Sequence, residues 1–246
     1  MSLYPEKERI QLHPAFILHQ RPYSNTSLLL DVLSKEHGRL SLIAKGARQP
    51  KSKFRGSLQP FQLISISWVR RTELGTLTHA ELCEKQHYLE GELMYAALYL
   101  NELLTRVLIN NDPVLDVFCA YAYALKSLKE KGIAPALRVF EYSLLQSLGF
   151  EIQLDHDTEQ NPILADRFYK FIPEHGFVKS NEKNVFLFQG THIQAFNNQE
   201  FETGEVLKTA QLLMQTGLKK IIGNEPLRSR ELFKAYNKMT NYNTEG

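Results

Sequence analysis

Cysteine and long apolar runs are scarce in this sequence of 246 residues. Its two cysteines, Cys83 and Cys119, are too few for a disulfide framework or a four-thiolate zinc site, and they do not form a redox CxxC pair. We expect them to be small buried residues of a protein from a reducing cytoplasm. No apolar run approaches the roughly 18 residues of a membrane-spanning helix, and the charged residues 1–12 do not resemble a secretory signal. The sequence therefore predicts a protein with no membrane association.

Motifs of covalent and nucleotide chemistry are also missing. The sequence has neither a GxxxxGK[ST] phosphate loop nor a GxSxG nucleophile elbow. Asp155, His156 and Asp157, with His175 downstream, could bind a metal, but no cysteine is near and no HxxxH or HExxH spacing occurs. We interpret them as a polar loop, with a metal-dependent nuclease using Asp155 and Asp157 as an alternative. The sequence thus predicts a binding protein without catalytic residues, cofactor or metal.

The first third of the chain has the alternating pattern of short strands separated by turns. The clearest example is residues 61–70, where Ile64, Ile66 and Trp68 share one face and Ser65 and Ser67 the other. The five predicted strands are residues 15–21, 27–33, 39–44, 61–70 and 76–83. Five strands in about 70 residues fit a barrel of the oligonucleotide/oligosaccharide-binding (OB) type, and a small SH3-like barrel fits nearly as well.

After residue 84 the apolar period becomes helical. Predicted helices cover residues 91–109, 111–131, 135–148, 205–222 and 229–238, with a small hairpin over 177–188 and an irregular segment over 151–172. The predicted fold class is therefore α+β, with an N-terminal five-stranded OB-type barrel (1–84) followed by a mostly α-helical domain (85–246). A small irregular or hairpin insertion occupies residues 151–190 of the second domain.

Charge is divided unevenly along the chain. The net charge is +2, but residues 1–80 hold 12 basic and 5 acidic side chains (+7), and residues 81–246 hold 17 and 22 (−5). From His37 to Thr72 there are eight lysines or arginines and no acidic residue. A basic stretch of this kind between two strands of a barrel favours binding to nucleic-acid phosphates, although a solvated loop with no partner is the alternative.

Two further groups of side chains could contact partners. Among the aromatic residues, Phe54 between Lys53 and Arg55 is the best candidate to stack on bases, Tyr23 is intermediate, and Phe16 and Trp68 are expected in the core. On the third helix, the Arg138 guanidinium could lie at the rim of an apolar surface or pair with Glu141. In residues 226–233 (PLRSRELF), Ser229 is expected to cap a helix whose first turn carries Arg228 and Arg230.

Several motifs in the same order resemble the RecO family of bacterial DNA repair proteins, which are recombination mediators. They are residues 21–27 (RPYSNTS), 38–39 (GR), 44–48 (AKGAR), 56–61 (GSLQPF), 99–107 (YLNELLTRV), 137–141 (LRVFE), 148–149 (LG) and 227–232 (LRSREL). The family has an N-terminal OB domain and a helical C-terminal domain. Many members carry four zinc-binding cysteines after the third helix, but residues 151–177 have none. We therefore expect no zinc there and a zinc-module-like insertion held by packing alone.

The resemblance implies a cytoplasmic, nucleoid-associated protein that binds single- and double-stranded DNA and anneals complementary strands. It also implies that the protein works with RecR to load RecA onto DNA coated with single-strand-binding protein, whose acidic C-terminal tail docks on the helical domain. An adaptor that recruits proteins and has little DNA affinity is the alternative. The predicted DNA-binding residues are Arg21, Arg39, Lys45, Arg48, Lys51, Lys53, Phe54 and Arg55. The predicted partner-binding residues are Leu137, Arg138, Leu145, Arg228 and Arg230.

Overall fold

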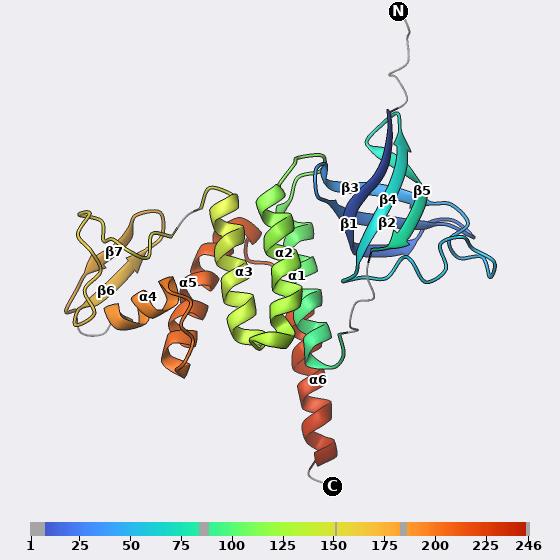
Figure 1. Ribbon diagram of the computed structural model, residues 1–246. Helices are drawn as coiled ribbons and strands as arrows, with labels where there is room; N and C mark the ends of the chain where they lie inside the picture. The colour runs from blue at the N-terminus through green and yellow to red at the C-terminus, as the bar shows by residue number, and fades with distance from the viewer. Residues whose placement is uncertain (1–7, 84–88, 151, 183–185, 245–246) are drawn as a thin grey trace, which may run out of the picture. The chain divides into compact units, whose positions relative to one another are not determined.

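The computed structural model describes residues 8–83, 89–150, 152–182 and 186–244 (Figure 1). The predicted domain boundary at residues 84 and 85 lies outside these ranges. The strands are β1 (Glu8–Pro22), β2 (Leu28–Ser34), β3 (Gly38–Ala44), β4 (Leu63–Arg70), β5 (Leu74–Leu82), β6 (Phe168–Ile172), β7 (Gly176–Lys179) and β8 (Phe188–Gln189). The helices are α1 (Glu92–Val107), α2 (Leu115–Glu130), α3 (Ile133–Ser147), α4 (Gly190–Asn197), α5 (Gly204–Ile222) and α6 (Arg228–Thr244).

The first five strands form a closed barrel in the order β1-β2-β3-β5-β4 (Figure 1). Neighbouring strands are antiparallel except β3 and β5, which are parallel. β1 pairs with both β2 and β4, and its register shifts at Ile10/His13 and Ile17/His19 let this long strand bend around the barrel. The prediction of an OB-type barrel is confirmed, and the SH3-like alternative is excluded.

The barrel core follows the predicted alternation. Ile64, Ile66 and Trp68 all point inward, and Trp68 is completely buried. Each large apolar side chain buried in this way contributes about 1.5–3 kcal/mol to folding. The core also contains Ile10, Ala15, Ile17, Leu30, Val32, Leu40, Leu42, Ala44, Phe54, Leu58, Leu77 and Ala80.

Helices α1 and α6 belong to the same compact unit as the barrel. This unit consists of residues 1–119 and 226–246. The Asn101 amide of α1 donates a hydrogen bond of 2.8 Å to the carbonyl of Leu18 in β1. The Tyr95 ring of α1 packs against the rings of Phe233 and Tyr236 in α6. α1 therefore contacts both the barrel and the C-terminal helix.

The first turn of α6 is bound by the Glu102 carboxylate of α1. Glu102 accepts hydrogen bonds from the backbone N–H groups of Arg228 (3.0 Å) and Ser229 (2.8 Å) and from the Ser229 hydroxyl (2.7 Å). Burial acts to raise the pKa of Glu102, but the Ser229 and Arg228 hydrogen bonds and Arg106 outweigh it and hold the pKa below its ordinary value. The prediction that Ser229 caps the helix is wrong, because α6 begins at Arg228 and the Ser229 hydroxyl donates to another helix.

The second compact unit, residues 120–225, combines α3, α4 and α5 with the end of α2 and a small sheet. The sheet has the order β7-β6-β8, and rings of Tyr169, Phe171, Phe177 and Phe188 pack against one another within it. α3 and α5 approach closely at Gly217, where an added Cβ would lie 2.8 Å from a methyl carbon of Leu145. Aromatic packing therefore forms the centre of the segment predicted as a zinc-module-like insertion.

Three predictions for the helical region are corrected by the structure. The hairpin is not at residues 177–188 but joins β6 to β7, so part of the segment predicted as irregular is a strand. α4 is missing from the predicted elements, because eight residues give too short a period to recognise. α2 begins at Leu115 rather than residue 111, where Asn111 has a left-handed φ of 61°.

The structure also bears on the cysteines and on membrane insertion. Cys83 and Cys119 are exposed, so the expectation that they are small buried residues is wrong. Within the described residues, no helix combines the length and the apolar character needed to cross a bilayer.

Candidate nucleic-acid interface

Two loops meet at one end of the barrel because of the strand register. Pro22, the last residue of β1, pairs with Leu28 at the start of β2, and Leu28 pairs with Ala44 at the end of β3. The loop between β1 and β2 and the long loop between β3 and β4 (residues 45–62, the β3–β4 loop) therefore leave the barrel side by side. Most of the predicted DNA-binding cations lie on these two loops.

The β3–β4 loop is a chain of tight turns. Backbone hydrogen bonds of 3.0–3.3 Å span three residues at a time from Ala44 to Ser57. Gly46 and Gly56 have left-handed φ angles of 71° and 80°, which a residue with a side chain rarely adopts. The backbone N–H of Arg48 also donates to the carbonyl of Thr26 (2.9 Å) in the neighbouring loop. The loop thus has a defined conformation despite its lack of helix or strand.

Apolar anchors fix this loop to the barrel. Phe54 is only 3% exposed, and both Phe54 and Leu58 belong to the barrel core. The prediction that Phe54 is an exposed stacking ring is therefore wrong. The burial of a single aromatic residue between two cations cannot be predicted from the sequence, because one residue shows no periodicity. The ring is buried because its removal from water contributes about 1.5–3 kcal/mol to folding.

The cations of the loop point away from the barrel core. Lys45, Arg48, Lys51, Lys53 and Arg55 are all exposed. Lys53 donates a hydrogen bond of 2.7 Å to the Thr78 carbonyl of β5 and lies 5.0 Å from the centre of the Phe54 ring. Among the described residues, Lys45, Lys51 and Arg55 have no ion-pair partner, so their charges are available to an external anion.

The neighbouring β1–β2 loop adds a cation and an aromatic ring. Arg21 is exposed at the end of β1, and the Tyr23 side chain is 44% exposed. The Arg48 guanidinium donates to the Ser24 carbonyl (3.1 Å), which joins this loop to the β3–β4 loop. Contacts of Arg48 and Lys53 with backbone carbonyls were not predicted, because pairing between distant segments leaves no local sequence pattern. Arg21 and the five loop cations form one surface, here called the basic surface.

Arg39 lies apart from the basic surface. It stands at the start of β3, and its guanidinium donates to the carbonyls of Thr105 (2.6 Å) and Leu108 (3.2 Å) and contacts Asp31 (3.4 Å). Arg39 thus binds the C-terminal end of α1, where carbonyl groups of the last turn lack helical partners. The structure does not bring it together with the other predicted DNA-binding residues.

The predicted partner-binding residues of α3 are mostly covered. Arg138 is 8% exposed and donates to the Glu141 carboxylate at 2.8 Å, so of the two readings for Arg138 the ion pair is present. Leu145 is fully buried at the close approach of α5, and Leu137 is partly buried. Leu145 is therefore not accessible to a ligand in this structure.

The two predicted partner-binding residues of α6 lie in the other compact unit. Arg228 uses its backbone N–H to bind Glu102, which leaves its side chain exposed at the surface. The exposed Arg230 guanidinium lies 5.3 Å from the centre of the Tyr99 ring and donates to its hydroxyl at 3.3 Å. These arginines are therefore more accessible to an acidic ligand than Arg138.

The Asp155–Asp157 segment is a hydrogen-bonded turn. Asp157 is buried, and one of its carboxylate oxygens accepts from the backbone N–H groups of Glu159 and Asn161, each at 2.9 Å. Asp155 lies 2.9 Å from His156, and the hydrogen bond from His156 holds the pKa of Asp155 below its ordinary value. Asp157 therefore stabilises the turn, in agreement with the interpretation of a polar loop.

Comparison with known proteins covers both parts of the chain. Residues 10–86 match the family described as "Recombination protein O N terminal", and residues 89–231 match "Recombination protein O C terminal". The chain is 40% identical over 229 residues to "DNA repair protein RecO" of Coxiella burnetii (strain RSA 493 / Nine Mile phase I). The aligned residues cover 92% of this chain and 98% of that protein.

Two other relatives carry the same name. The protein of Photobacterium profundum is 41% identical over 224 residues, covering 90% of this chain and 95% of its own length. The protein of Haemophilus influenzae (strain 86-028NP) is 39% identical over 225 residues, covering 91% and 95%. The similarity therefore extends across the barrel and the helices alike.

Proposed function

Because the chain belongs to the RecO family of DNA repair proteins, we propose that it is a recombination mediator that binds single- and double-stranded DNA and anneals complementary strands. We propose further that, with RecR, it helps load RecA onto DNA coated with single-strand-binding protein. The observation that supports DNA binding is the basic surface, where exposed cations stand on an ordered loop within a sequence stretch free of acidic residues.

The composition of the basic surface accounts for both kinds of DNA. Lysine and arginine attract phosphates of any sequence, and this part of binding is the same for single and double strands apart from their charge density. With Phe54 buried, Tyr23 is the exposed ring that could stack on a base. Contacts to phosphates would reduce the repulsion between two strands and leave most base edges free to pair, as annealing requires.

Annealing of complementary oligonucleotides, with and without single-strand-binding protein, tests this proposal. We expect the protein to accelerate annealing of both naked and coated strands and to lose the effect at high salt, because phosphate contacts weaken as counterions compete. A protein that leaves both rates unchanged at low salt would contradict the proposal. Acceleration on naked strands alone would contradict only the link to single-strand-binding protein.

We propose that the acidic C-terminal tail of single-strand-binding protein is the second ligand. Arg228 and Arg230 are exposed and suited to carboxylates, whereas Arg138 would first have to leave Glu141. Titration of a labelled tail peptide should show weaker binding for Arg228→Ala and Arg230→Ala than for the control Lys234→Ala. Equal affinity for all three would contradict this assignment, and a loss confined to Arg138→Lys would move the site to α3.

The adaptor alternative, with little DNA affinity, differs in one observable: tail binding would be strong while oligonucleotide binding is weak. We also propose that the protein acts without cleaving DNA, in the cytoplasm at the nucleoid. Incubation of DNA with the protein and Mg²⁺ or Mn²⁺ should leave the DNA intact. Cleavage that disappears in Asp155→Asn would instead support the nuclease reading of the 155–157 segment.

A further inference from the structure

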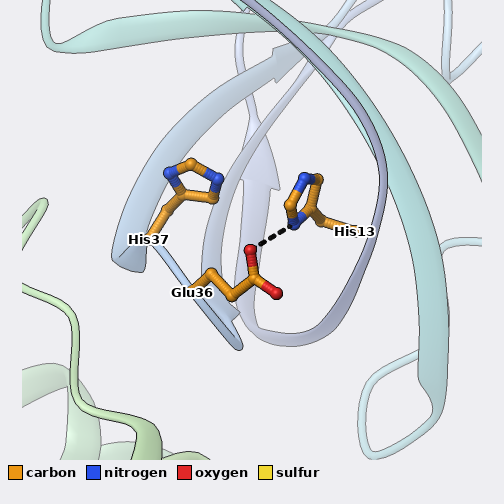
Figure 2. A group of neighbouring side chains, drawn as sticks. All are labelled: His13, Glu36 and His37. Carbon is orange, nitrogen blue, oxygen red and sulfur yellow. Dashed lines mark ion pairs between the residues drawn. The ribbon is translucent and has the colours of Figure 1, made fainter.

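Three side chains of types that can ligate a metal ion meet on the barrel at the turn between β2 and β3. His13 projects from β1, and Glu36 and His37 lie in that turn. Figure 2 shows the two imidazole rings and the Glu36 carboxylate facing a common space. One ligand atom from each residue lies within 4.8 Å of the ligand atoms of the other two. Two histidines and a carboxylate are a donor set of zinc and other divalent transition metals.

The backbone that carries these side chains is fixed from several directions. In β1 the register shifts between Ile10 and His13, and Leu12 within this bulge has a left-handed φ of 54°. A bulge changes the direction of the side chains beside it, here that of His13. The backbone N–H of Lys35, next to Glu36, donates to the carbonyl of Pro14, next to His13, at 3.0 Å. The two segments are therefore joined directly beside the cluster.

The distance between His13 and Glu36 fits two ligands of one metal ion better than a direct hydrogen bond. His13 Nδ1 and Glu36 Oε2 are 3.5 Å apart, whereas a charge-assisted N–H···O bond is about 2.7–2.9 Å long. Two ligands at about 2.0–2.2 Å from a tetrahedral zinc ion are separated by roughly 3.3–3.6 Å. The rings of His13 and His37 are 4.9 Å apart and nearly perpendicular. The three donor atoms lie within 4.8 Å of one another, so rotation of the side chains can bring them closer to a shared ion.

The surrounding residues hold the imidazole rings in place and reduce the positive charge that would repel a metal ion. The buried Trp68 indole packs edge to face against His37 at 5.1 Å and His13 at 6.0 Å between ring centres. The nearby guanidinium of Arg70 forms an ion pair with Glu8, which reduces its repulsion of a cation.

We propose that His13, Glu36 and His37 form a binding site for a divalent transition-metal ion, with zinc as the expected ligand. Three protein ligands leave a fourth position of a tetrahedral zinc ion for water or another external oxygen ligand. The ion would connect β1 to the β2–β3 turn and so stabilise the barrel. The site is independent of the zinc module considered for residues 151–190, and it differs from the metal-free protein that the sequence predicts.

The single tryptophan of the chain makes the proposal directly measurable. Binding of paramagnetic Cu²⁺ beside Trp68 should quench its fluorescence in the full chain prepared without a histidine tag. Zn²⁺ should restore the fluorescence by displacing Cu²⁺, and calorimetry with Zn²⁺ alone should give one ion per chain. Zinc should also raise the melting temperature by about 2–4 °C, because it binds the folded state.

Variants separate this site from other histidines. His13→Ala and His37→Ala should weaken zinc binding by at least about tenfold. The matched control is His79→Ala, since His79 Nε2 also lies 3.5 Å from a glutamate oxygen, that of Glu81, and the described residues around that pair supply no third ligand. Its zinc affinity should equal that of the wild type.

Glu36→Gln keeps the test valid if a histidine variant fails to fold. The Glu36 side chain is 62% exposed and removing its charge should not disturb the core, so circular dichroism should be unchanged while zinc affinity falls. Absence of stoichiometric zinc binding by the wild type would overturn the proposal. Zinc binding or copper quenching that is the same in wild type, Glu36→Gln and the folded histidine variants would overturn it equally.

Discussion

Gly38 has a backbone conformation that no other residue can adopt without strain. Its φ is 65°, and an added Cβ would lie 1.8 Å from the carbonyl oxygen of Asp112. The β2–β3 turn therefore rests directly on the segment that follows α1, and Asn111 donates its backbone N–H to the Arg39 carbonyl at 2.8 Å in the same place. A hydrogen atom as side chain is what allows this contact.

Gly38→Ala should accordingly lower the free energy of unfolding by more than about 2 kcal/mol, since the strained φ and the steric overlap add. Gly56→Ala is the matched control: it has a φ of 80° but nothing within 4 Å of the added Cβ, and it should cost only about 1 kcal/mol. Urea denaturation monitored by Trp68 fluorescence measures both. Equal losses would show that the backbone at residue 112 is not in contact with Gly38.

Sequence reasoning at this scale succeeds where a residue belongs to a pattern. Alternation correctly assigns Ile64, Ile66 and Trp68 to the core, and the loop cations are recognisable because charge is explicit in the sequence. Phe54 is misplaced because its burial depends on the path of an irregular loop. The pairing of His13 with Glu36 has no sequence signal, because the barrel brings together residues that are apart along the chain and share no motif.

At the scale of helices and strands, Glu102 connects α1 to α6. Its carboxylate accepts three hydrogen bonds at the first turn of α6, where backbone N–H groups lack helical acceptors. Glu102→Gln should lower the free energy of unfolding by about 1–2 kcal/mol, because hydrogen bonds to a charged acceptor are lost. Glu231→Gln changes an exposed acid in the same turn and serves as the control.

The pH dependence of this effect follows from the direction of the shift. The folded-state pKa of Glu102 is below its ordinary value of 4.5, so its contribution is fully present above about pH 4.5. It is lost as the pH falls through the lower folded pKa. The difference between wild type and Glu102→Gln should therefore shrink in acid, and amide exchange of residues 228–236 should be faster in the variant at neutral pH. A difference that grows in acid would contradict the assignment.

The Arg138–Glu141 pair is a buried ion pair within α3. Arg138→Ala should cost about 3–5 kcal/mol, because it leaves the buried Glu141 carboxylate without its cation. Arg138→Met combined with Glu141→Gln should be markedly more stable than Arg138→Ala, since no charge is then buried. Thermal denaturation compares them, and equal stability of the two variants would mean that the ion pair contributes little.

Short elements limit what the sequence can predict for the helical region. The stripe of Leu100, Leu103 and Leu104 on α1 is long enough to show a period, and all three are fully buried. β6, β8 and α4 contain five, two and eight residues, and their packing on aromatic neighbours rather than a repeated pattern determines them. Tertiary contacts therefore decide the structure of residues 168–197.

At the scale of the whole molecule, the positive charge of the N-terminal sequence gathers on one part of the barrel. The excess of positive charge in residues 1–80 is concentrated on the basic surface at one end of the barrel, on a loop that Phe54 and Leu58 anchor. The grouping of the chain into compact units could not be read from the sequence, because α6 joins α1 and the barrel although about 120 residues of sequence separate the two helices.

Salt dependence of oligonucleotide binding tests the role of the basic surface most directly. The loop variant replaces Lys45, Lys51 and Arg55 by alanine, three cations without ion-pair partners among the described residues. The control variant replaces Lys126, Lys129 and Lys208 by alanine. These lysines lie outside the barrel, and their replacement changes the net charge by the same amount.

Fluorescence anisotropy with a single-stranded oligonucleotide at several salt concentrations gives the slope of log affinity against log salt. The loop variant should have a slope smaller in magnitude by about 2, at roughly 0.7 per lost phosphate contact, and weaker binding at low salt. The control should match the wild type in slope. Equal slopes for wild type and loop variant, or an equal reduction in the control, would contradict DNA binding through the basic surface.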